Sequence, residues 1–134
     1  MTTWNAGGVE EWSRRYPIEL RPLPRAVADS AHAARLEVLP PDLQDAFREQ
    51  HRAPAHYPPL QGLVFGTDGT LWVGLHPVEA ERPYLALDSV GRLIGRVLVP
   101  RDGRISAGGR GVIWVIEQDD LSVESLVRYS VEWD

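Results

Sequence analysis

The spacing of apolar residues changes twice along the chain and divides it into three stretches. In the first stretch, residues 1–20, Trp4 comes before the turn-forming run Asn5–Gly8, and Val9 and Trp12 follow it. A pair of glycines supplies the positive φ angles that a tight hairpin needs. This pattern predicts a pair of strands, followed by an extended connector in which prolines interrupt regular hydrogen bonding.

The second stretch, residues 25–52, carries apolar side chains at helical spacing and is rich in alanine and arginine, so it is predicted to be helical. Pro24 suits the start of a helix. Pro40 and Pro41 end this helix and open a second one, in which Asp42 falls in the first turn, where a negative charge is favoured. We therefore expect a helical segment between two strand-rich stretches.

The third stretch, residues 60–134, alternates apolar and polar residues and is punctuated by glycine-containing turns. An Asp-Gly turn at residues 67–70 and a second turn at residues 88–91 are typical of β-hairpins. Short strands at this spacing indicate antiparallel sheets rather than parallel βαβ units. The predicted strands are Leu60–Phe65, Leu71–His76, Tyr84–Leu87, Leu93–Val99, Gly103–Ala107, Val112–Glu117 and Leu126–Trp133.

An internal repeat relates two parts of the third stretch by a shift of 42 residues. The shift places Leu71–Val73 on Ile113–Val115, so that Trp72 corresponds to Trp114. A period of about 40–45 residues with four short strands is the size of one blade of a β-propeller. The alternative interpretation is two similar hairpins in an ordinary sandwich. The same shift also relates Leu63 to Ile105, Gly66 to Gly108, Gly69 to Gly111 and Leu85 to Val127.

Three segments carry motifs of a known family: GLVFGTDGTLWVGL at 62–75, YLALDSVGRLIGRVLVP at 84–100 and GVIWVIEQDDLSVESLVRYSV at 111–131. The first has an Asp-Gly turn before a Leu-Trp-Val strand, the second a hairpin that ends at a proline, and the third an acidic turn between two strands. Residues 57–134 thereby resemble the C-terminal part of bacterial six-bladed β-propellers of the NHL/TolB-like type. Residues 1–56 resemble a preceding hairpin followed by a helical insertion.

The resemblance implies a single domain over residues 1–134, mainly β with a helical segment. It would be a partial β-propeller, with about two blades of antiparallel four-stranded sheet plus one or two helices. Residues 1–20 would form the hairpin of a preceding blade and residues 25–52 the helical insertion. Residues 57–100 would form one blade, and residues 101–134 an incomplete last blade.

A partial propeller leaves sheet faces and edges without neighbouring blades, because a closed six-bladed ring needs roughly twenty-four strands. Three outcomes are compatible with this. Several chains could assemble into a homo-oligomer that completes a ring, the sequence could be a piece of a larger propeller, or the N-terminal hairpin and helices could cover the exposed faces. We expect the second or third outcome, because the helical stretch is long enough to act as a lid.

Composition narrows the classes of activity. The chain of 134 residues has a formal net charge of −5, which argues against a nucleic-acid partner. All of its bases are arginine, so a P-loop lysine and a Schiff-base mechanism are excluded. Cysteine is absent, which excludes disulfides, thiol catalysis and cysteine-ligated metals.

The sequence shows neither a membrane segment nor a targeting signal. Its apolar runs fall well short of the ~20 residues of a membrane span, and its N-terminus lacks the apolar region of a signal peptide. We therefore predict no association with a membrane. As written, the chain is expected to be cytoplasmic, and it would be extracytoplasmic if it is part of a secreted propeller.

Candidate metal and phosphate ligands are sparse. His76 with Glu79 and Glu81 could offer an imidazole and carboxylates to zinc or manganese. The acidic run Glu117–Asp120 lacks the spacing of a calcium loop, and Gly108–Gly111 lacks the following helix of a phosphate-binding loop. Charged residues are usual in loops between strands, so we interpret the first two groups as solvated charges and the third as a turn.

The remaining histidines and the tryptophans are given structural roles. His32 is expected to be exposed on a helix, and His51 lies near a helix C-terminus, where positive charge is favoured. The five tryptophans could form a ligand platform. Trp72 and Trp114 occupy equivalent repeat positions, however, which favours a packing role, whereas Trp133 could be exposed.

These observations favour a non-catalytic, propeller-like domain that binds a protein, a peptide or a small molecule, or that has a structural role. No catalytic, cofactor-binding or metal-binding residue is assigned, and no cofactor is expected. The alternative is a propeller-type hydrolase or lyase, active only as an assembled or complete ring. Guanidinium groups that could bind ligand carboxylates lie in or beside strand connections, at Arg82, Arg101, Arg104 and Arg110. The favoured interpretation of each is an ordinary surface arginine.

Overall fold

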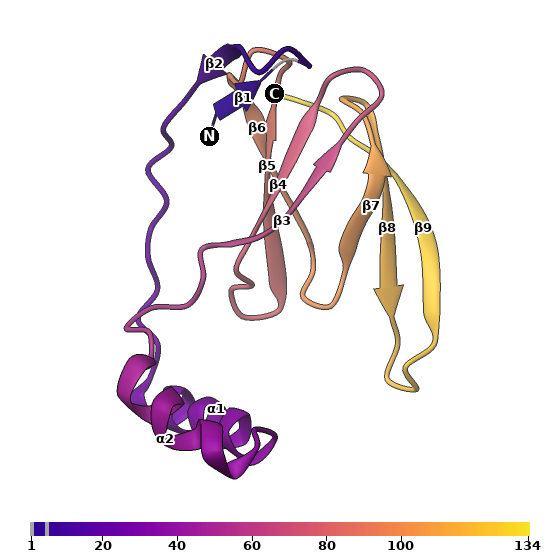
Figure 1. Cartoon of the computed structure of the whole chain (residues 1–134). Helices are drawn as coiled ribbons and strands as arrows, with labels where there is room; N and C mark the ends of the chain where they lie inside the picture. Colours follow the sequence, from indigo (N-terminus) through magenta and orange to yellow (C-terminus); the bar gives the residue numbers. More distant parts are fainter. Residues whose placement is uncertain (1, 5) are drawn as a thin grey trace. The chain divides into compact units, whose positions relative to one another are not determined.

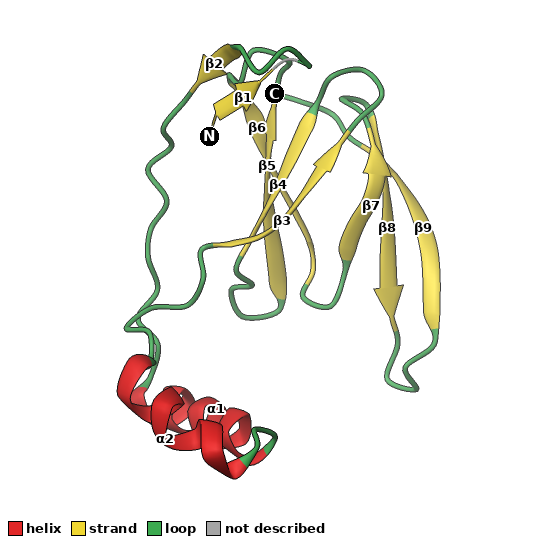
Figure 2. Cartoon of the chain, in the orientation of Figure 1, coloured by secondary structure: helices red, strands yellow, loops and turns green. Residues whose placement is uncertain are grey.

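The computed structural model describes residues 2–4 and 6–134, which fall into two compact units (Figure 1). One unit combines the described part of Met1–Pro17 with Leu60–Asp134, and the other is Ile18–Pro59. The first unit contains the strands and the second contains the helices (Figure 2).

The strand-rich unit contains three antiparallel sheets. The N-terminal pair consists of β1 (Thr2–Trp4) and β2 (Glu10–Ser13), as its sequence pattern predicts. The other two sheets have the orders β3-β4-β5-β6 and β7-β8-β9, so that each strand pairs with its neighbour along the chain. Their strands are β3 Leu60–Phe65, β4 Leu71–Leu75, β5 Glu81–Leu87, β6 Leu93–Pro100, β7 Arg104–Gly108, β8 Val112–Gln118 and β9 Glu124–Ser130.

The helical unit contains α1 (Arg25–Glu37) and α2 (Pro41–Gln50), which are separated around Pro40, as predicted. A proline also occupies the first turn of α2, where its missing N–H costs no intrahelical hydrogen bond. The side-chain amide of Gln44 donates a hydrogen bond to the Leu39 carbonyl oxygen at 3.0 Å. This bond ties the first turn of α2 to the connection between the helices.

The two larger sheets share one apolar cluster, the inter-sheet core, which is built around the fully buried side chain of Trp72. Alternation along each strand sends every second side chain into this core. The Tyr84 hydroxyl accepts a hydrogen bond from the Ile105 N–H at 3.2 Å, which joins the sheets within the core. Its buried members are Trp72, Tyr84, Ala86 and Val99 from the four-stranded sheet and Ile105, Ile113 and Val115 from the three-stranded sheet.

The N-terminal segment packs on the opposite face of the four-stranded sheet. Tyr16 contacts a second apolar cluster there, and the Trp12 indole N–H donates to the Ser89 carbonyl oxygen at 2.9 Å. A Cβ on Gly91 would lie 2.5 Å from the Trp12 ring, so this turn needs glycine for close approach as well as for its φ of +74°. The buried residues of this second cluster are Leu71, Val73 and Leu87.

The observed elements confirm a mainly β fold with a helical segment, and they correct two strand boundaries. β5 begins at Glu81 rather than at Tyr84, because its pairing with β6 continues past Pro83. β9 is displaced toward the N-terminus from the predicted Leu126–Trp133, because its pairing with β8 ends at Ser130.

Two expectations about tryptophans are wrong. Trp114, the repeat equivalent of Trp72, is 38% exposed, because it points away from the inter-sheet core while its two neighbours in β8 point into it. Trp133 is half-buried, since its ring stacks on Trp72 with centroids 6.0 Å apart. Its indole N–H also donates to the Arg110 carbonyl oxygen at 2.7 Å.

A matched pair of tryptophan variants tests the assigned core. We expect Trp72→Ala to lose about 3–5 kcal/mol of unfolding free energy, because removing a buried aromatic side chain leaves a cavity. Trp114→Ala should lose about 1 kcal/mol or less, since this side chain is partly exposed. Urea unfolding followed by circular dichroism measures both values, and equal losses would contradict the assignment.

Candidate functional site

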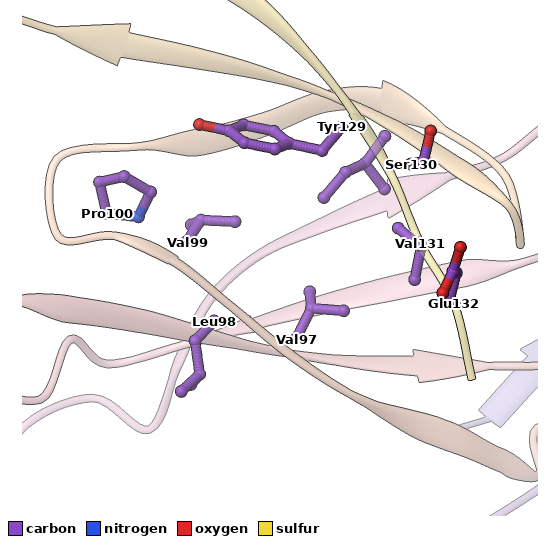
Figure 3. Close-up of a pocket in the computed structure, with 9 residues that line it drawn as sticks. Val97, Leu98, Val99, Pro100, Tyr129, Ser130, Val131 and Glu132 are labelled. Atoms are coloured by element: carbon purple, nitrogen blue, oxygen red, sulfur yellow. The ribbon is translucent and has the colours of Figure 1, made fainter. Parts of the chain in front are cut away.

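The strand-rich unit carries an apolar cleft of about 290 Å³ between β6 and the end of β9, which we call the β6–β9 cleft. Figure 3 shows Tyr129 and Val131 on one side of it and Val97 and Val99 on the other. The residues that line the cleft are Val97, Leu98, Val99, Pro100, Ile113, Tyr129, Ser130, Val131 and Glu132.

The cleft lies where the outer strands of the two sheets face each other. In β6, Val97 and Val99 belong to the inter-sheet core side, whereas Leu98 points to the other face (Figure 3). β6 is one edge of the four-stranded sheet and β9 is one edge of the three-stranded sheet. Within the described residues no strand lies beyond β9, so the cleft runs alongside an open sheet edge.

A hydrogen bond holds the aromatic wall of the cleft in place. The Tyr129 hydroxyl donates to the Glu117 carboxylate at 2.5 Å, across the β8–β9 pair. This bond, assisted by partial burial and by the negative charge of Glu117, raises the pKa of the Tyr129 hydroxyl above its ordinary value of 10.0. The hydroxyl therefore stays protonated at neutral pH and its ring presents an apolar face.

Glu132 gives the rim of the cleft a negative charge. Its side chain is exposed and lines the cleft just beyond the end of β9. The ion pairs found among residues 2–4 and 6–134 involve other acids, so no described base neutralises this carboxylate. The arrangement suits a ligand with apolar groups and one positive charge.

Two other hollows have different linings. A hollow of about 380 Å³ surrounds the Val78–Glu81 turn and includes Arg96 in its wall. Another of about 460 Å³ lies between the N-terminal strand pair and the turns that follow β3 and β5, with Trp12 and Phe65 in its wall. Neither hollow lies between the edge strands β6 and β9.

A polar contact joins the two larger sheets at turns that the repeat relates. Asp68, between β3 and β4, accepts hydrogen bonds from the backbone N–H groups of Arg110 at 2.7 Å and Thr70 at 3.0 Å. These two hydrogen bonds, of which the one from Arg110 has the larger effect, lower the pKa of the Asp68 carboxyl below its ordinary value of 3.8. A Cβ on Gly109 would lie 2.5 Å from Asp68 Oδ2, so a side chain there would displace this carboxylate. Gly108–Gly111 therefore contains a turn, as predicted, and one of its N–H groups already binds a carboxylate of the same chain.

The candidate metal ligands do not form a site in the described part of the chain, where no three His, Asp or Glu side chains are placed to hold an ion. His76 lies 3.5 Å from the side-chain amide of Gln61. Glu79 has a φ of +53°, and its carbonyl oxygen accepts a hydrogen bond from Arg101 at 2.6 Å, while Glu81 begins β5. The alternative activity as a propeller-type hydrolase or lyase stays a prediction.

The acidic run after β8 shapes a turn. Asp119 Oδ1 accepts hydrogen bonds from the backbone N–H groups of Leu121 and Val123, both at 2.9 Å. Aspartate commonly stabilises turns in this way, because its short side chain reaches backbone groups a few residues along. The run therefore has a structural role in addition to being solvated.

The four arginines considered as carboxylate binders lie in separate surroundings. Arg104 pairs with Glu124 at 3.1 Å on the surface of the three-stranded sheet, and Arg82 is half-buried on β5. Arg101 donates to a backbone carbonyl, and Arg110 contributes its backbone N–H to the turn contact described above.

Two histidines of the helical unit pack on one aromatic ring. His32 is half-buried rather than exposed, because it stacks on Phe47 with ring centroids 5.2 Å apart. His51, at the predicted end of α2, stacks on the same ring at 4.2 Å. His56 is exposed and takes part in an isolated bridge with Pro22.

Sequence reasoning missed the residues of the β6–β9 cleft. Val97 and Tyr129 read as ordinary members of alternating strands, and the predicted strands contain both. Whether these residues line a cleft depends on the distance between the outer strands of the two sheets, which no local sequence pattern encodes. The available signal was the number of strands, because residues 57–100 predict four and residues 101–134 predict three.

Comparison with known proteins gives no match: no family model, no curated protein and no solved structure is similar to this chain. Among the described helices, none is long and apolar enough to cross a membrane. The geometry of the described residues is therefore the basis for a functional assignment.

The contact at Asp68 predicts a pH dependence of stability. Since folding lowers this pKa, the carboxylate stabilises the fold above its unfolded pKa, and the stabilisation is lost as pH falls through the folded pKa. We expect Asp68→Asn to lose about 1 kcal/mol at neutral pH, because the group is exposed and screened, and to show a weaker acid dependence. Asp88→Asn is the control, since Asp88 accepts hydrogen bonds only within its own turn among the bonds described.

Urea unfolding between pH 7 and about 2.5 measures this effect. A parallel loss of stability in wild type and Asp68→Asn over the acid range would show that another carboxyl group is responsible.

Proposed function

We propose that this chain is a non-catalytic, propeller-like binding module, in which the sheets β3–β6 and β7–β9 are successive blades and the β6–β9 cleft binds the ligand. The 42-residue shift supports the relation between the sheets, because it carries β3, β4 and β5 onto β7, β8 and β9. The observation that carries the binding role is the cleft itself, an apolar concavity beside an open sheet edge.

The orientation of equivalent residues supports a stack of repeats. Trp72 faces the inter-sheet core, whereas its equivalent Trp114 lies on the far face of the next sheet. Val115 faces the same core, whereas its equivalent Val73 lies in the second cluster on the far side of the four-stranded sheet. The face of one sheet that carries Trp72 and the face of the other that carries Trp114 therefore point in the same direction, as expected for stacked repeats.

The turns support the same relation. Asp68 and Arg110 are 42 residues apart in sequence and are joined by a hydrogen bond. Gly66 lies against the backbone of its own repeat equivalent, Gly108. The two residues are so close that a Cβ on Gly66 would clash with the Gly108 carbonyl oxygen. Equivalent positions of the two repeats are thus adjacent, as they are between neighbouring blades.

The chemistry of the cleft favours binding over catalysis. Its walls are mainly aliphatic and aromatic, with one hydroxyl held by Glu117 and one charged group at the rim, Glu132. Binding sites typically combine an apolar surface with a few polar groups that orient the ligand. A volume of about 290 Å³ suits a small molecule or a few side chains of a protein or peptide.

Titration with the neutral fluorescent probe N-phenyl-1-naphthylamine tests the site. We expect wild type to bind the probe and Tyr129→Glu to bind it about tenfold more weakly or worse, because the substitution places a charge in an apolar wall. Trp114→Glu is the matched control, since it adds the same charge to the opposite face of the same sheet. Circular dichroism verifies that both variants are folded. Loss of binding in Trp114→Glu but not in Tyr129→Glu would place the site elsewhere.

A further inference from the structure

We propose that the ligand of the β6–β9 cleft is an extended peptide segment that pairs with the open edge of β9 as an added antiparallel strand. This inference rests on the proposed function, because it names the ligand class of the same cleft. Three observations carry it: the direction of the backbone groups of β9, the position of the cleft beside that edge, and the charge of Glu132.

Alternate residues of β9 direct their backbone groups to the open side of the sheet. At one end of the β8–β9 ladder, the Val131 N–H donates to the Gly111 carbonyl oxygen at 2.9 Å. At the other end, the Val123 carbonyl oxygen accepts from the Asp119 N–H at 3.1 Å. Odd-numbered residues therefore bond to β8, and even-numbered residues face away from it. The residues of β9 whose N–H and C=O groups face the open side are Glu124, Leu126, Arg128 and Ser130.

The cleft lies where an added strand would place its side chains. On the inner face of the sheet, such a strand would lie next to Tyr129 and opposite Val97 and Val99 of β6 (Figure 3). Every second side chain would then enter the apolar cleft, since side chains alternate between faces. Backbone hydrogen bonds would provide affinity and the cleft would select apolar side chains, as in other cases of strand addition.

The four-stranded sheet contains a template for the occupant. β5 is the repeat equivalent of β9, and β6 pairs with β5 in an antiparallel ladder from Glu81↔Pro100 to Leu87↔Leu93. β6 sends Val97 and Val99 toward the inter-sheet core. A strand that ran in the same direction beside β9 would send such apolar side chains into the cleft with its register shifted by one residue, because Leu126 and Arg128, the equivalents of Tyr84 and Ala86, lie on the outer face of β9.

Charge determines which end of the occupant carries a basic residue. Glu132 lies just beyond the C-terminal end of β9, and in an antiparallel pair this end faces the N-terminal end of the added strand. A lysine or arginine there would neutralise a carboxylate that has no ion-pair partner among the described residues. Residues 92–100 of this chain have the required chemistry, because Arg92 precedes the apolar strand β6.

A synthetic peptide with the sequence Arg-Leu-Ile-Gly-Arg-Val-Leu-Val-Pro, that of residues 92–100, is a suitable probe. Two further versions of the peptide carry N-methyl groups, one on its odd-numbered residues and the other on its even-numbered residues. A strand that pairs through one edge uses the backbone N–H groups of only one of these two sets. In fluorescence anisotropy titrations we expect one methylated peptide to bind like the parent and the other about tenfold more weakly or worse.

A proline variant tests the edge from the side of the protein. The Arg128 N–H faces the open side, so Arg128→Pro removes a donor from the edge without breaking a bond to β8. We expect it to weaken binding of the parent peptide about tenfold or more, whereas the matched variant Arg128→Ala should bind like wild type. Glu132→Gln should weaken binding a few-fold and reduce its dependence on salt.

The outcomes separate this inference from the proposed function. Equal effects of the two methylation patterns, or equal binding by Arg128→Pro and Arg128→Ala, would overturn strand addition. Binding of N-phenyl-1-naphthylamine without binding of the peptide would also overturn it, while leaving the cleft as a site for small apolar molecules. Self-association that Arg128→Pro abolishes, without peptide binding, would overturn it by assigning the edge to a second copy.

Discussion

The packing of the two larger sheets around Trp72 is the contact on which the rest of the structure depends. A small sheet with an apolar face needs a second layer, and here each of the two larger sheets is the second layer for the other. The bond from Ile105 to Tyr84 and the contact at Asp68 fix the two sheets along the side where β3 lies beside β7. On the other side, β6 and β9 are the outer strands, and the cleft between them follows from this arrangement.

The outer faces of the two larger sheets differ in what covers them. On the four-stranded sheet, Trp12 and Tyr16 bring the N-terminal segment onto the outer apolar cluster. On the three-stranded sheet, Arg128 is exposed, whereas Ala86, which the 42-residue shift relates to it, is fully buried. Burying Arg128 in the same way would require a partner for its charge. These features agree with the expectation that the N-terminal hairpin covers an exposed face, and a ring completed by further copies stays a prediction.

The sequence predicted the elements better than their contacts. Alternation, glycine turns and proline breaks are local signals, so the strands and both helices were found close to their observed bounds. The 42-residue shift related strands to one another, but not which face of each sheet is covered, so the packing role predicted for Trp114 is wrong. The hydrogen bond from Arg110 to Asp68 and the cleft at Tyr129 depend on the packing of residues far apart in sequence. Local patterns in a single sequence do not predict such long-range packing.

The edge of β9 carries charged residues on one face of the sheet and lies beside the cleft on the other. Exposed edges invite uncontrolled pairing, and proteins commonly place charged residues on them. Glu124 and Arg128 do this on the outer face of β9. The inner face instead carries Tyr129 and, just after the strand, Val131, both of which line the cleft. A strand that paired with this edge, as we propose, would meet Glu124, Leu126 and Arg128 on the outer face and apolar side chains on the inner face. An extended ligand that matched this pattern would differ from a uniformly apolar strand.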